Sequence, residues 1–102
     1  MIVQSFFKWV ALKHLIKGSD SAGAFSSHLV KIDANCILDT HCHEGCQELH
    51  EVVDGEGICE FDKERFAYHP GQMTLIPKGI CHKVTAGEEG ILLLAKFIPA
   101  LI

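Results

Sequence analysis

The sequence predicts an all-β protein folded as a single closed antiparallel barrel or sandwich. From about residue 25 onward, short segments rich in β-branched and aromatic residues alternate with turn signals, and these signals recur at intervals of roughly 8–12 residues. Many short strands on short connections favour closure, because closure removes exposed sheet edges. A chain of 102 residues has the length of one domain.

The turn signals are short glycine- and proline-containing stretches such as Asp54–Gly57, Pro70–Gly71 and Gly87–Gly90. Between the turns we expect strands near 26–32, 36–43, 48–53, 57–61, 65–69, 73–76, 82–86 and 91–98. The pattern therefore assigns residues 25–102 to the β-domain and leaves 1–24 as a separate N-terminal segment.

The N-terminal segment is amphipathic, but its pattern leaves the type of structure open. The residues with helical spacing are Ile2, Val3, Phe6, Phe7 and Val10. The same stretch equally suits an edge strand. We expect this segment to act as a flap over one face of the barrel or as a dimer contact.

Composition and charge argue against several classes of partner. The chain carries a net charge of −4 and its single arginine is Arg65, whereas nucleic-acid binding requires clustered lysines and arginines. No apolar run reaches the roughly 18 residues that span a bilayer, and the N-terminus lacks the features of a secretory signal. We therefore expect a cytoplasmic protein that by itself binds neither nucleic acid nor membrane.

The cysteines are odd in number and are expected to be reduced thiols rather than a disulfide framework. They are Cys36, Cys42, Cys46, Cys59 and Cys81. One alternative is a thiolate zinc site built from Cys42 and Cys46 with Cys36 or Cys81, which the absence of a paired CxxC spacing disfavours. Cys42 and Cys81 flank histidines and are expected to face outward as small packing residues.

The His-Cys-His triplet is the strongest chemical signal in the sequence. Alternate side chains of a strand share one face, so His41 and His43 project together. Glu48 opens the next strand after a glycine-containing bend, and His82 follows a Pro/Gly turn far along the chain. Ligands held on different strands of one barrel suit a rigid metal site.

These residues resemble the two sequence motifs of the cupin superfamily. The first motif is matched by His41, His43, Glu48 and Gly55, and the second by Gly71, Pro77, Gly79 and His82. The first glycine of the family pattern is Asn35 here, which tolerates a left-handed conformation, and the final asparagine is Ala86. The resemblance covers about residues 25–98.

The resemblance implies a small double-stranded β-helix, or jelly-roll barrel, that holds one divalent metal ion on His41, His43, Glu48 and His82. Three neutral imidazoles and one carboxylate leave such an ion with a net charge of about +1 and open coordination positions. Fe, Mn, Ni, Zn and Cu all suit this donor set to some degree. An anionic or chelating oxygen ligand would complement it.

Two functions are open at this stage. One is the binding or transformation of a small oxygen-rich metabolite at the metal. The other is small-molecule or sugar sensing, because the run 50–82 is also similar to the sensor domains of AraC-like transcription regulators, here without a DNA-binding domain. The apolar ends of the chain indicate a homodimer under either reading.

Several further residues carry expectations of their own. His50 and Gln47 are candidates for orienting the metal ligands, and Glu51, Tyr68 and His50 for acid/base work. Exposed or packing positions are expected for His14, His28 and His69, although strand parity would also let His28 line the pocket. The expected core and pocket wall comprise Phe61, Phe66, Leu75, Leu93 and Phe97.

Overall fold

The computed structural model describes residues 3–7 and 9–102, with side chains from Trp9 onward. Within this part the protein is antiparallel β-structure almost throughout, as the sequence predicts. None of its helices has the length and hydropathy needed to cross a membrane. The elements are β1 (Val3–Phe7), β2 (Val10–Ile16), the short 3-10 helix η1 (Gly18–Asp20), β3 (Ser26–Ile32), β4 (Ile37–His41), β5 (Gln47–Phe61), β6 (Glu64–Tyr68), β7 (Met73–Ile76) and β8 (His82–Ile98).

Two long strands, β5 and β8, pair with each other along almost their whole lengths. The turns expected at Asp54–Gly57 and Gly87–Gly90 are instead bends inside these strands, and the β5–β8 register shifts on both sides of Asp54–Gly55. Glycine-rich bulges let a strand bend without ending its ladder. The four strands predicted there are therefore two continuous ones.

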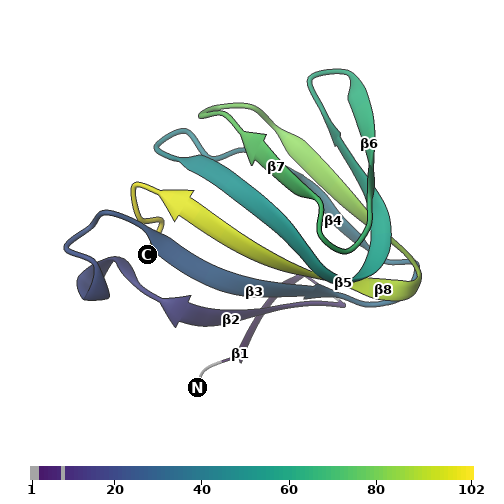
Figure 1. The fold of residues 1–102 in the computed structure, drawn as a ribbon, viewed down its shortest axis with the longest axis horizontal. Helices are drawn as coiled ribbons and strands as arrows, with labels where there is room; N and C mark the ends of the chain where they lie inside the picture. The colour runs from purple at the N-terminus through teal and green to yellow at the C-terminus, as the bar shows by residue number, and fades with distance from the viewer. Residues whose placement is uncertain (1–2, 8) are drawn as a thin grey trace.

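The bends divide the structure into two packed halves of a jelly roll. The first half of β5 pairs with β7 and with the second half of β8, which also pairs with β3. The second half of β5 pairs with β6 and with the first half of β8, which also pairs with β4. Figure 1 shows β5 and β8 turning at one side of the molecule, where the two halves meet.

In the described part of residues 2–17 the chain forms strands, which resolves the alternative that its pattern left open. β1 pairs with β2, and β2 pairs with β3 with Val10 opposite Ile32. Both of these side chains are buried in the core, so β2 extends the sheet that covers the barrel interior. Ile2 lies outside the described residues, and the roles of flap and dimer contact stay predictions.

The core lies between the two halves and follows the alternation expected of strands. Its buried members include Val10, Val30, Ile32, Leu38, Val52, Val84, Leu93 and Phe97. Phe61 and Phe66 stack on each other and pack against this core while partly exposed. The expectation for Leu75 is wrong: it is 53% exposed because it pairs with Leu49 on the outward parity of β5 and β7.

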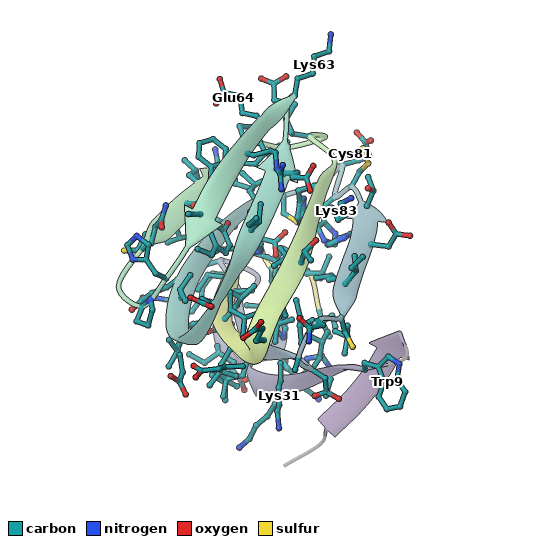
Figure 2. All side chains as sticks on the ribbon, turned by 90° about the vertical axis from the view of Figure 1, so that its right-hand side faces the viewer. Trp9, Lys31, Lys63, Glu64, Cys81 and Lys83 are labelled. Atoms are coloured by element: carbon teal, nitrogen blue, oxygen red, sulfur yellow. A yellow bond between two sulfur atoms is a disulfide. The ribbon has the colours of Figure 1, made fainter. Side chains whose placement is uncertain are left out.

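The outer ends of the molecule carry polar side chains and one exposed aromatic. Figure 2 shows Lys63 and Glu64 at the tip of the β5–β6 hairpin and Trp9 at the other end of the molecule. Asp62 and Lys63 both adopt positive φ in this two-residue turn, as tight hairpin turns require. The interior, and not these ends, holds the histidine cluster.

Gly55 is required by the bend in β5. It has φ +78°, and a Cβ there would collide with the carbonyl oxygen of Gly90 on β8. We predict that Gly55→Ala lowers the free energy of unfolding by about 3 kcal/mol, measured by urea denaturation, because left-handed strain and a backbone clash add together. Gly71→Ala is the matched control: it has φ +90° with open space around it and should cost about 1 kcal/mol. Equal losses would show that the close approach of the strands is unimportant.

Candidate metal centre

The four motif residues meet at one end of the barrel interior because of strand pairing. His41 ends β4 and lies opposite His82, the first residue of β8. Glu48 lies near the start of β5 and is 4% exposed, while His82 is 1% exposed. His43 follows β4 and faces the same side as His41, half-buried. The sequence prediction that these residues converge is in agreement with this geometry.

The ligand-type atoms of the four side chains all lie within 4.8 Å of one another. Glu48 Oε1 lies 2.9 Å from His82 Nε2 and 3.7 Å from His43 Nε2. The His41 and His82 rings are 4.1 Å apart between centroids. Within the described residues, this is the one group of histidine, cysteine and acidic side chains arranged so that it could hold a metal ion.

Three buried side-chain atoms of the described residues make no directed hydrogen bond: Glu48 Oε1 and His82 Nε2 in the cluster, and Gln72 Oε1 outside it. Glu48 Oε1 and His82 Nε2 face each other at 2.9 Å, yet their geometry does not make a directed hydrogen bond. Buried polar atoms are normally paired, and an unpaired one indicates a strained site or an ion. A cation between these atoms would satisfy both, so the residues fit a divalent metal.

Backbone carbonyls orient two of the imidazoles. The Nδ1 of His41 donates to the carbonyl oxygen of Asp39 at 2.9 Å, and that of His82 approaches the carbonyl oxygen of Ile80 at 3.4 Å. A ring that donates through Nδ1 leaves Nε2 as the lone-pair atom, and such a contact is typical of metal-ligating histidines. Both Nε2 atoms are therefore available to the shared centre.

A buried relay supports Glu48 on its other side. His50 Nε2 donates to Glu48 Oε2 at 2.7 Å, and His50 Nδ1 is hydrogen-bonded to Tyr68 OH at 3.0 Å. His50 and Tyr68 are each 1% exposed. The expectation for His50 as an orienting residue agrees with this contact, whereas Gln47 is exposed and Glu51 lies on the outward parity of β5. Tyr68 holds His50 and does not line the cavity.

The electrostatic environment keeps the donor set ready for a cation. Burial by itself raises the pKa of Glu48, but the adjacent imidazoles of His50 and His82 outweigh burial and hold that pKa far below its usual range. Burial lowers the pKa of His41, against the opposing hydrogen bond to Asp39, and burial likewise lowers that of His43, against the charge of Glu48. Near neutral pH these groups are an ionised carboxylate and two neutral imidazoles.

A cavity of about 480 Å³ opens from the cluster into the barrel. His41, His43 and Glu48 lie at one end, and His14 and His28 line it farther along. His28 thus lines the pocket, as its strand parity allowed, and the partly buried His14 joins it there because β2 pairs with β3. His69 is exposed, as expected.

The cysteine expectation is wrong for one pair. Cys42 and Cys81 form a disulfide, with Cα atoms 4.2 Å apart, because the pairing of His41 with His82 places their neighbours side by side across β4 and β8. Both are exposed, as predicted, and Figure 2 shows Cys81 at the surface. The pairing also removes two sulfurs from the alternative thiolate zinc site, and Cys46 is buried as a free thiol. Disulfides are commoner in oxidising compartments than in the cytoplasm. The cytoplasmic location stays a prediction.

Comparison with known proteins agrees with the fold and the motif. The sequence pattern of the cupin domain family matches residues 28–95, well over half of the chain, so this protein belongs to the cupin family. Its structure is similar to KdgF from Halomonas sp., with a TM-score of 0.86 and 22% identity over 97% of this chain and 86% of that one. No curated protein sequence matches it.

Two further solved structures show the same jelly roll. An RmlC-like cupin from Shewanella frigidimarina has a TM-score of 0.84 and 17% identity, over 98% of this chain and 85% of that one. Ectoine synthase from P. lautus has a TM-score of 0.83 and 22% identity, over 95% of this chain and 69% of that one. At these identities the likeness establishes the fold.

We predict that His43→Ala and His82→Ala each lower bound metal at least about tenfold, since each removes a ligand atom from a four-donor set. Elemental analysis of the purified protein after dialysis measures this, and circular dichroism checks that the barrel remains folded. His69→Ala removes an exposed histidine outside the cluster and is the matched control. Unchanged metal content in both cluster variants would contradict the site.

The disulfide closes a loop with a sequence separation of 39 residues. We predict that Cys42→Ser/Cys81→Ser lowers the free energy of unfolding by about 2–4 kcal/mol, because the cross-link restricts the unfolded chain. Urea denaturation with and without a thiol reductant measures the loss, and reduced wild-type protein should match the double variant. Cys36→Ser changes a free cysteine and controls for the loss of a thiol. If a reductant leaves the free energy of unfolding of the wild type unchanged, the pairing is contradicted.

Proposed function

We propose that the protein binds one divalent metal ion through His41, His43, Glu48 and His82 and uses it to hold an oxygen donor of a small molecule. One observation carries the proposal: four ligand atoms lie within 4.8 Å of one another, and two of them, Glu48 Oε1 and His82 Nε2, are buried without a directed hydrogen bond. A three-imidazole, one-carboxylate set suits Fe, Mn, Ni, Zn or Cu.

The chain's own residues hold the donor atoms in place for this role. The His50–Tyr68 relay restrains one carboxylate oxygen of Glu48 and so leaves the other directed at the imidazoles. The carbonyl of Asp39 fixes the ring of His41. A bound divalent ion would supply Lewis acidity and an attachment point for an anionic oxygen.

Both transformation and sensing of the ligand are compatible with this site. The similarity to ectoine synthase favours an enzyme only through the shared fold, since cupins of one fold carry out different functions. The cavity itself favours binding without chemistry: beyond the metal ligands, its described ionisable lining is His14 and His28, which are hydrogen-bonded to each other. A sensing domain of the AraC-like type is therefore the second candidate function.

A spectroscopic experiment tests whether the metal has open positions. We predict that cobalt-substituted protein changes its visible spectrum when oxalate is added, because an oxygen chelate enters the coordination sphere. His69→Ala should behave like wild type, and His82→Ala should show neither bound cobalt nor the change. A cobalt-loaded protein whose spectrum oxalate leaves unchanged would contradict the proposal.

Oxygen uptake and product analysis separate the two candidate functions. Iron-loaded protein that consumes oxygen, or converts a member of a panel of diols, thiols and keto acids, is an enzyme. Saturable binding of a small molecule that is recovered unchanged supports the sensor. Homodimerisation and cytoplasmic location remain predictions alongside either outcome.

A further inference from the structure

We propose that the ligand of this site is an amphipathic organic acid: an acid group with an adjacent oxygen that binds the metal, followed by an apolar aliphatic or aromatic body. This inference rests on the proposed metal site and narrows its ligand from oxygen-rich small molecules in general. It follows from the walls of the cavity, from the partners of the polar groups there and from the charge at the metal cluster.

The walls of the cavity beyond the metal cluster are apolar. Leu12 on β2, Val30 on β3, Leu38 on β4 and Phe97 on β8 all line it. Leu12, Val30 and Phe97 come from three neighbouring strands of one half of the jelly roll, and Leu38 comes from the other half, so apolar side chains line the space from both halves. Apolar walls favour an apolar ligand by removing its surface from water.

The polar groups on the far wall already bond to one another. His28 Nδ1 lies 2.8 Å from His14 Nδ1, and His28 Nε2 lies 2.9 Å from Ser26 Oγ. Ser26 Oγ also accepts from the backbone N–H of Leu101 at 3.0 Å. Both ring nitrogens of the buried His28 are thus occupied, and a ligand hydroxyl placed beside it would break an existing bond.

A polyhydroxylated ligand would therefore lose hydrogen bonds to water and regain few inside. Each buried hydroxyl left unpaired costs about 1–3 kcal/mol, while each buried methylene contributes about 0.8 kcal/mol. The lining thus discriminates against sugars and sugar acids on the side away from the metal. It favours a ligand whose oxygens are confined to one end.

Phe97 joins the metal end to the far end of the cavity. Its ring packs edge-to-face against His43 at 4.9 Å and against His28 at 5.5 Å between centroids. Phe97 therefore offers an apolar aromatic surface beside the cluster to a ligand bound there. An alkyl chain or a second ring suits such a contact.

The charge at the metal end specifies an anion. A divalent ion with three neutral imidazoles and one carboxylate retains a net charge of about +1, and Glu48 is the one acidic side chain in the described lining of the cavity. A 2-hydroxy or 2-oxo acid offers one negative charge and two adjacent oxygens. Such a head group neutralises the site and leaves the rest of the molecule on apolar wall.

The test measures the affinity of zinc-loaded full-length protein for a matched series of acids by isothermal titration calorimetry. Glycolate, 2-hydroxybutyrate and 2-hydroxyhexanoate share one chelating head and differ in apolar length. Gluconate has the head and the six-carbon chain of 2-hydroxyhexanoate but carries hydroxyls along it. We expect affinity to rise about threefold to fourfold per methylene, and 2-hydroxyhexanoate to bind at least about tenfold tighter than gluconate.

A pair of variants assigns the preference to the cavity wall. Val30→Thr places a hydroxyl at a buried lining position and should lower the affinity ratio of 2-hydroxyhexanoate to glycolate by at least about threefold. Val53→Thr makes the same change at a position that is 46% exposed and should leave the ratio unchanged. Should Val30→Thr not fold, Leu12→Asn on the same cavity wall replaces it.

The outcomes separate this inference from the function on which it rests. Protein that retains no zinc, or that retains zinc and binds none of the acids, overturns the proposed metal site and its role. Zinc-loaded protein that binds gluconate as tightly as 2-hydroxyhexanoate overturns the apolar ligand alone. If Val30→Thr, or Leu12→Asn in its place, leaves the affinity ratio of 2-hydroxyhexanoate to glycolate unchanged, the apolar wall is not the cause of the preference.

Discussion

The carboxylate of Glu48, buried among imidazoles, is the constraint on which the architecture of the site depends. An ionised carboxylate in a protein interior is costly unless it is paired and hydrogen-bonded. Here His50 engages one oxygen at 2.7 Å, and His82 lies 2.9 Å from the other. Because these partners come from two long strands and Tyr68 from a third, the charge is compensated only when the whole barrel is formed.

The long β5–β8 pairing makes this compensation possible. Glu48 and His50 lie in the first half of β5, and His82 begins β8, yet the two strands pair from Gln47 to Phe61. The glycine bends return both strands across the core, so groups at distant ladder positions approach one another in space. Gly55 permits this bend by its positive φ and its lack of a side chain. The bend of the paired strands β5 and β8 thus forms both the barrel and the site.

Much of the site could be predicted because it depends on short-range alternation and motif spacing. His41 and His43 share a face in any strand, and the spacing to Glu48 and His82 is read directly along the chain. The β-class followed from turn signals for the same reason. The N-terminal strands were harder, because apolar residues in 2–17 satisfy two periodicities and only pairing with β3 decides between them.

Features that depend on pairing across the barrel could not be derived in this way. The glycines of 54–57 and 87–90 suit a turn or a bulge equally, and only the register of β5 against β8 distinguishes them. The Cys42–Cys81 bond had a signal in hindsight, since each cysteine adjoins a predicted ligand. Its recognition required knowing that His41 lies opposite His82.

The disulfide places a solvent-accessible covalent bond directly beside two of the candidate metal ligands. Its sulfurs face solvent, while the histidines next to them in the chain face the interior. A thiol reductant in the medium can therefore reach this bond, which joins the ends of β4 and β8, without entering the cavity. The disulfide and the cavity thus lie on opposite faces of the same two strands, one facing solvent and the other the interior.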